Sequence, residues 1–234
     1  MTEVDFGQIS SYQRYKLMAS LIVPRPIALV TTLGSNGVVN AAPFSMFNMV
    51  GEDPPIVMLS INRLKDGWLK DTAANILSHG EFVVHMTDEL MAEKMHACGD
   101  ALPPDQSELD HVGLTPCPSI TIKPPRIQEA PVAFECVLHE KLETESRYVF
   151  IGRVTWMAAR EGLIDTQAWR VNLRHYHPNR ALRCTSFRSR VCQPKCIQPH
   201  RPDALPRNHR ASLPVRNQSW SCLPKHRLEM RLRS

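Results

Sequence analysis

Several familiar signatures of catalysis are missing from this chain of 234 residues. It contains no G-x-S-x-G nucleophile turn, no H-E-x-x-H metal-binding helix and no phosphate-binding P-loop. It also lacks G-x-G-x-x-G, which argues against a Rossmann-type dinucleotide site. Since no nucleophile–base pair stands out, any redox or transfer chemistry would have to come from a bound cofactor.

Long hydrophobic runs are also absent. No stretch of 18 or more apolar residues occurs, so we expect no membrane-spanning helix. The first residues, Met1 to Phe6, are polar and acidic, unlike a secretory signal. Before residue 178 there are three widely spaced cysteines, Cys98, Cys117 and Cys136. We expect them to be free thiols in a reducing cytoplasm.

Glycine is absent from residues 178–234, although the chain has 10 glycines. The same segment holds 13 of the 28 lysines and arginines but only 2 of the 23 acidic residues, and it has seven prolines. Low hydrophobicity combined with high net charge leaves too little apolar surface to offset the entropy of ordering. We therefore predict one domain over residues 1–178 and a disordered, basic tail over residues 179–234.

Three interpretations of this tail remain open. It has residue types that bind zinc, but their spacing is not that of a standard zinc finger. They are Cys192, Cys196, His200, His209 and Cys222. Its charge would suit nucleic acid, but Phe187 and Trp220 are its only aromatic residues, so we expect neither nucleic acid nor a membrane as partner. The abrupt change in composition also fits a frameshift near Pro178, which resequencing and mass spectrometry of the tail peptides would test.

The body alternates short β-branched segments with turn signals. Strands are expected at residues 27–32, 38–47, 56–61, 81–86, 119–122, 133–142 and 148–157. Helices are expected at residues 12–21, 70–77 and 90–97, and a long loop at residues 99–113. Asp71 or Thr72 would cap the second helix, and Gly80 would end it. Because the connections are too short for repeated βαβ crossovers, we predict a mainly β fold, an antiparallel barrel with added helices.

One run between two expected strands has an unusual composition. Asn40-Ala41-Ala42-Pro43-Phe44-Ser45-Met46-Phe47-Asn48 combines small, polar and aromatic residues where an ordinary strand would be aliphatic. Small side chains let the backbone come close to a flat ligand, and the amides and hydroxyls can bond to its polar edge. The run therefore favours a site for a planar cofactor.

This run and six other ordered motifs resemble the flavin reductase-like FMN-binding split-barrel family, within it the reductase component of nitrilotriacetate monooxygenase. The other motifs are Pro24–Thr32, Asp53–Pro55, Lys70–Thr72, Gly113–Pro116, Pro124–Ile127 and Glu129–Ala133. The resemblance covers residues 21–178. It implies an antiparallel split β-barrel, a homodimer that holds FMN near the subunit interface, and NAD(P)H as hydride donor. In many members the reduced flavin serves a separate monooxygenase.

The resemblance and the chemistry of the side chains together nominate ten residues for FMN binding. Amides and hydroxyls suit the ribityl chain and ring edge, whereas a guanidinium, an ammonium and a helix N-terminus suit the phosphate. The candidates are Asn40, Ala42, Phe44, Ser45, Asn48, Ser60, Asn62, Arg63, Lys70 and Thr72. We nominate no catalytic residue and no metal ligand. Arg147 is a weaker candidate, for contact with a nicotinamide nucleotide.

Simpler interpretations stay open beside these. Phe44 also suits an ordinary core, Thr72 a helix cap, and His85 a packed histidine. At the level of function, the main alternative is a non-catalytic or electron-transfer FMN protein on the same barrel. A lesser alternative is nucleic-acid binding through the tail.

Overall fold

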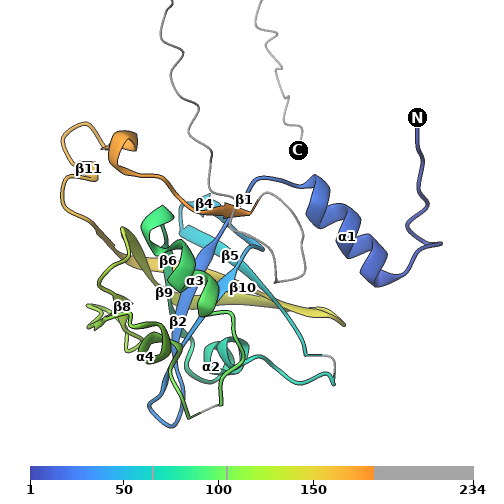
Figure 1. Cartoon of the computed structure of the whole chain (residues 1–234), viewed down its shortest axis with the longest axis horizontal. Coiled ribbons are helices and arrows are strands. Elements are labelled where there is room, and N and C mark those ends of the chain that lie inside the picture. Colours follow the sequence, from blue (N-terminus) through green and yellow to red (C-terminus); the bar gives the residue numbers. More distant parts are fainter. Residues whose placement is uncertain (65, 104, 182–234) are drawn as a thin grey trace, which may run out of the picture. The chain divides into compact units, whose positions relative to one another are not determined.

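The computed structural model describes residues 1–181 apart from 65 and 104. Its centre is a seven-stranded antiparallel sheet with the strand order β3-β2-β6-β9-β10-β5-β4 (Figure 1). The strands are β2 (Ala28–Leu33), β3 (Val39–Phe44), β4 (Phe47–Glu52), β5 (Pro55–Asn62), β6 (Glu81–Met86), β9 (Val132–Glu143) and β10 (Arg147–Ala159). The predicted mainly β, antiparallel fold class is confirmed.

The two edges of this sheet are joined by a very short corner. β3 and β4 are the edge strands, yet only Ser45 and Met46 separate them. A flat sheet of seven strands is about 29 Å across, whereas this link spans at most about 11 Å. The sheet must therefore curl until its edges approach each other. The Met46 carbonyl then accepts a hydrogen bond from the Ser60 N–H at 2.8 Å, which starts β4 alongside β5.

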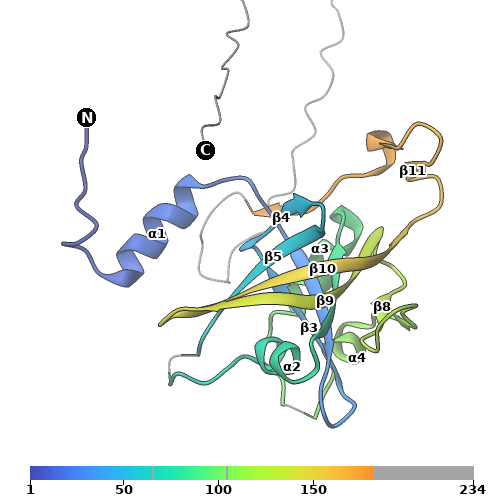
Figure 2. The ribbon, with the colours of Figure 1, turned by 180° about the vertical axis from the view of Figure 1, so that it is seen from behind.

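This corner corrects the expectation of a single strand over residues 38–47. At Ser45 the chain leaves one edge of the sheet and crosses to the other. Seen from behind, β5, β10 and β9 lie side by side across the curled sheet (Figure 2). The result is a barrel with a split between its edge strands, as predicted.

A short helix covers the free edge of β3. α4 (Glu108–Val112) lies where a loop was expected. The Ser107 hydroxyl donates to the Val39 carbonyl at 2.7 Å, and the Glu108 carboxylate accepts from the Ala41 N–H at 2.8 Å. These bonds satisfy backbone groups that would otherwise invite pairing with another chain.

The remaining helices pack around the barrel or lead into it. They are α1 (Ser11–Leu21), α2 (Asp71–His79) and α3 (Ala92–Ala97), with the 3₁₀ turns η1 (Glu89–Met91) and η2 (Leu173–His175). α2 buries Ala73 and Ile76 in the barrel core. Its N-cap is Lys70, with no capping bond from a side chain, so the expected cap by Asp71 or Thr72 is wrong. Gly80 ends α2 at φ 68°, as predicted.

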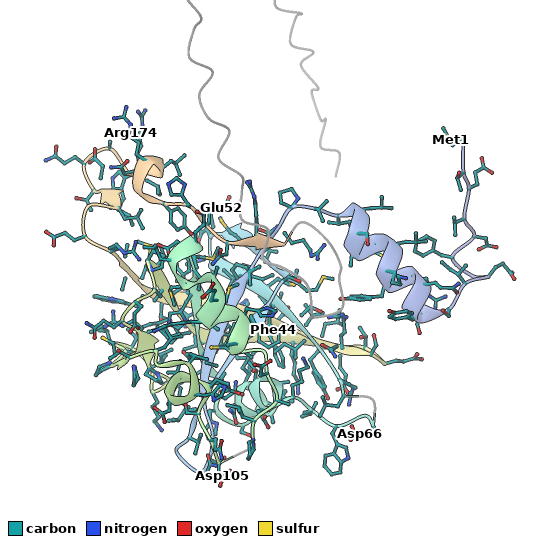
Figure 3. The ribbon with its side chains drawn as sticks, viewed as in Figure 1. Met1, Phe44, Glu52, Asp66, Asp105 and Arg174 are labelled. Carbon is teal, nitrogen blue, oxygen red and sulfur yellow. The ribbon has the colours of Figure 1, made fainter. Side chains whose placement is uncertain are left out.

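The barrel interior is apolar and tightly filled. Phe82, Phe150 and Leu59 are fully buried there, and Phe44 joins them from the end of β3. Figure 3 places Phe44 centrally, whereas Asp66 lies at the periphery on the β5–α2 loop. Phe44 is therefore a core residue, whatever else it contacts.

Gly152 on β10 is required by this packing. A Cβ at this position would lie 2.4 Å from Cζ of Phe82. We expect Gly152→Ala to lower the free energy of unfolding by about 1–3 kcal/mol, measured by urea denaturation. Phe82→Leu in the same chain should recover part of this loss in a double-mutant cycle. If the changes in unfolding free energy of the two single variants simply added in the double variant, the proposed clash between a Cβ at position 152 and Phe82 would be contradicted.

The segment that follows α1 pairs with the last described residues beside the barrel. β1 (Arg25–Pro26) pairs with β13 (Arg180–Ala181). Asn179 is 5% exposed, and its amide donates to the Thr87 hydroxyl at 3.0 Å. Residues 179–181, which the sequence assigned to the tail, thus make contacts of the domain. The expectations of disorder, zinc, nucleic acid or a frameshift concern residues beyond 181, outside the described part.

Smaller elements complete the fold. β7 (Pro116–Cys117) pairs with β8 (Arg126–Ile127), and β11 (Ile164–Asp165) pairs with β12 (Arg170–Val171). Residues 119–122, expected as a strand, are irregular instead, with bends at 120–122. In the residues described, no helix is long and apolar enough to cross a membrane. Cys98, Cys117 and Cys136 are free thiols, as expected.

Candidate functional site

Polar side chains gather on the outer face of the barrel where β4, β5 and β10 lie together. Ser60 and Asn62 alternate with buried residues along β5, so they face outward. Asn62 of β5 lies directly opposite Arg147 of the neighbouring strand β10, so Arg147 is on the same face. Asn48 of β4 lies opposite Met58 and shares this face too. The curled sheet therefore assembles one polar outer surface from three strands.

Lys70 and Arg147 form a cationic pair beside this surface. Lys70 is half-buried at the start of α2, and its ammonium makes no ion pair or hydrogen bond with any described residue. Burial, and secondly the nearby charge of Arg147, lower the pKa of Lys70. Arg147 makes one long bond, 3.5 Å, to the Ser60 carbonyl, and no ion pair within the described chain. An anion bound between these two cations would relieve both.

Arg63 is a different case, because it already has partners. Its guanidinium forms an ion pair with Glu143 and donates to the Tyr148 hydroxyl at 3.1 Å. It also lies 4.7 Å from the centre of the Tyr148 ring. Arg63 is thus held at the edge of the barrel, and its attraction for a further anion is weaker than that of the Lys70 and Arg147 pair.

Asn40 and Thr72 belong to a second, internal group. The Asn40 amide donates to the Thr72 hydroxyl at 2.9 Å, and Thr72 is 1% exposed. The amide of Asn75 donates to the Thr32 hydroxyl at 3.0 Å. These four residues link α2 to the end of the β2–β3 hairpin, so their polar groups are largely engaged with one another.

The other sequence candidates fall between these two groups. Ser45 is half-buried in the corner beside Ser60, whereas Ala42 packs against the barrel core. Asn48 and Asn62 are exposed and bond to the backbone of their own neighbours. The structure therefore brings Ser60 and Lys70 together with Arg147, and Ser45 precedes Met46, whose carbonyl accepts from the Ser60 N–H. For Arg147, the sequence signal was only its place just before a strand.

His85 is a structural residue, as its simpler interpretation held. It is fully buried, with Nδ1 donating to the Leu29 carbonyl at 2.9 Å and Nε2 accepting from the Ile127 N–H at 2.9 Å. Burial lowers the pKa of His85 to about 4, from an ordinary value of 6.5. The bond that Nε2 accepts from Ile127 requires the neutral ring, whereas the bond to Leu29 would persist in the charged ring.

This gives a prediction for the dependence of stability on pH. Above pH 6.5 the neutral ring is present in both states and the His85 contribution is complete. As the pH falls from 6.5 towards 4, the unfolded chain binds the proton first, so the free energy of unfolding should fall. His85→Gln should be less stable at neutral pH and should lose part of this slope, measured by urea denaturation at several pH values. An equal slope in the variant would assign the effect to other groups.

Two cavities among the described residues lie elsewhere. One of about 440 Å³ is lined by residues such as Arg160, Leu163 and Asn172, and one of about 210 Å³ by residues such as Cys117 and Arg126. Neither is lined by any of the ten candidates. The outer face of β5 and β10 is therefore the candidate site because Lys70 and Arg147 lack acidic partners there, and not because the surface is hollow.

The fold is a split β-barrel whose outer face carries two cations, Lys70 and Arg147, with no acidic partner in the described part of the chain. Residues 18–178 match the flavin reductase like domain family, so the chain belongs to this family. The anticipated resemblance is confirmed. Among curated relatives, a protein of Aquifex aeolicus (strain VF5) with no assigned activity is 41% identical over 164 residues, which are 70% of this chain and 83% of that protein.

Solved structures agree with this assignment. Nitrilotriacetate monooxygenase component B from Bacillus cereus has a TM-score of 0.74 and 35% identity, over 78% of this chain and 92% of that chain. The Pseudomonas fluorescens 2-nitrobenzoate 2-nitroreductase NbaA has a TM-score of 0.70 and 38% identity, over 84% of this chain and 98% of that chain. The chain resembles both along nearly their full length.

Proposed function

We propose that this protein binds FMN on the outer face of β5 and β10 and works as an NAD(P)H:flavin oxidoreductase. The observation that carries the proposal is the pairing of Lys70 with Arg147, two cations that have no acidic partner in the described chain. A phosphate monoester is the kind of group that such a pair binds. The N-terminus of α2, a nine-residue helix that begins beside Lys70, would add its backbone N–H groups.

The residues present fit the rest of the cofactor as well. In the proposed site, the hydroxyls of Ser45 and Ser60 and the amide of Asn48 would bond to ribityl or ring-edge atoms. When bound, the flavin would supply hydride acceptance and donation, chemistry that no side chain here provides. The protein's own part would be to hold the phosphate, orient the ring and keep one ring face open for a nicotinamide. Both solved relatives carry names of redox enzymes, which supports this class of reaction.

We further propose that a second copy of the chain completes the site. Met49 and Val50 on β4, next to Asn48, are 61% and 51% exposed, which is unusual for apolar residues on an edge strand. Burial of this edge against a partner subunit would also wall in a flavin that otherwise lies on an open face. A separate monooxygenase that receives reduced flavin, and a cytoplasmic location, complete the proposal.

The test starts from the visible spectrum of the purified full chain. We expect tight uptake of FMN, with an absorption band of bound flavin, and bleaching of that band by NADH or NADPH in the absence of air. Turnover with added flavin in air would establish the oxidoreductase. Bound flavin that neither nicotinamide reduces would instead support an electron-transfer or non-catalytic flavoprotein.

A further inference from the structure

Arg147 is contacted by a residue from outside the barrel. The central carbon of its guanidinium lies over the ring of Tyr15, 5.8 Å from the ring centre. Tyr15 belongs to α1, which precedes the first strand of the sheet. Sequence reasoning did not nominate Tyr15, because nothing in a weakly amphipathic helix indicates which ring will meet a distant arginine.

α1 is held to the barrel mainly at its C-terminal end. Among its eleven residues only Ala19 is buried. Arg25, itself 8% exposed, donates from its guanidinium to the carbonyls of Ala19 and Ile22, the latter at 2.8 Å. A guanidinium at the negative end of the helix dipole is a favourable anchor. Arg25 thus fixes the C-terminal end of α1, and Tyr15 lies about two turns before that end.

The contact with Tyr15 leaves the bonding edge of Arg147 available. An aromatic ring interacts with a guanidinium through the ring face, whereas the guanidinium N–H groups point outward in their own plane. Arg147 can therefore contact Tyr15 and a phosphate together. A long arginine side chain without such support loses rotamer entropy when it binds an anion.

We propose that Tyr15 is a positioning residue that holds Arg147 ready for the flavin phosphate. The inference depends on the proposed function, because it assumes that the anion is the phosphate of FMN. It makes α1 a part of the cofactor site instead of a mere lead into the barrel. It also predicts that the effect of Tyr15 depends on the phosphate and not on the flavin ring.

The experiment compares FMN with riboflavin, which has the same ring and ribityl chain but no phosphate. Affinities are measured by quenching of flavin fluorescence in the full chain. We expect Tyr15→Ala to weaken FMN binding about 3- to 10-fold and to leave riboflavin binding unchanged. Tyr15→Phe keeps the ring and should retain most of the affinity. Tyr12→Ala, on the same helix with its ring near Lys16, is the matched control and should behave like wild type.

The outcomes separate the inference from the function on which it depends. Equal loss of FMN and riboflavin, an equal loss in Tyr12→Ala, or full affinity in Tyr15→Ala would each overturn the positioning role. Circular dichroism shows whether α1 persists in each variant, and a loss confined to variants that lack the helix would also overturn it. Failure of the wild-type chain to bind FMN would refute the proposed function itself.

Discussion

Lys70→Met should weaken FMN binding at least about 10-fold while the folded protein gains stability. Methionine keeps the length and apolar stem of lysine but removes the charge. In the folded protein, burial and Arg147 lower the pKa of Lys70, so the charged form is disfavoured there relative to the unfolded chain. Removal of this cation therefore relieves the free protein and deprives the bound phosphate of a partner.

Because FMN affinity should fall while the free energy of unfolding rises, this result could not be explained by misfolding. Affinity for FMN and for riboflavin would be measured by fluorescence titration, and stability by urea denaturation. Only FMN binding should fall. Lys141→Met, at an exposed position on β9, is the matched control for net charge and should change neither quantity. Combining Ser45→Ala with Lys70→Ala should weaken FMN binding further without unfolding the barrel. Unchanged FMN affinity in that double variant would mean that the Asn40–Asn48 run serves only to pack the core.

Glu135→Ala should cause the largest loss of stability, about 3–5 kcal/mol. The Glu135 carboxylate is fully buried, and it accepts hydrogen bonds from the N–H groups of Ile120 at 2.9 Å and Thr121 at 2.7 Å. Nε of Arg126 lies 3.6 Å from it. Burial raises the pKa of Glu135, but the bonds from Ile120 and Thr121 and the charge of Arg126 outweigh it and lower the pKa overall. Alanine would leave these N–H groups without their acceptor and Arg126 without its counter-charge.

The consequence should be local as well as global. The carboxylate holds residues 119–122 against the barrel, so hydrogen exchange there should increase in the variant even below its unfolding transition. Glu140→Ala, an exposed position on the same strand, should cost less than about 0.5 kcal/mol. Equal costs at the two positions would show that the buried network contributes nothing of its own.

This same network explains one limit of prediction from sequence. Residues 119–122 alternate like a strand, but Glu135, far along the chain, supplies the acceptors that a neighbouring strand would have provided. Local signals succeeded where backbone geometry decides the outcome. The strand over residues 81–86 and the helix end at Gly80 were predicted to the residue, the latter because φ is positive there.

The candidate site was only partly predictable for a similar reason. Ser60 and Lys70 carry side chains whose chemistry suggests phosphate, and they lie close together in sequence. Arg147 reaches the same face through strand register, and Tyr15 through the path of α1. Asn40 and Thr72 have suitable chemistry too, but whether an amide bonds to a ligand or to a neighbouring hydroxyl depends on packing that the sequence does not display.

The two-residue corner between β3 and β4 also has a consequence for how the chain reaches its fold. β2 with β3, and β4 with β5, are local hairpins of the kind that forms within about 1–10 μs. The corner links them into one unit early, yet β5 finds β10, and β2 finds β6, only after long segments of chain have been closed into loops. Topologies dominated by such distant pairings fold in about milliseconds to seconds. We therefore expect the two linked hairpins to form first. The pairings of β5 with β10 and of β2 with β6, which complete the barrel, should form slowly and last.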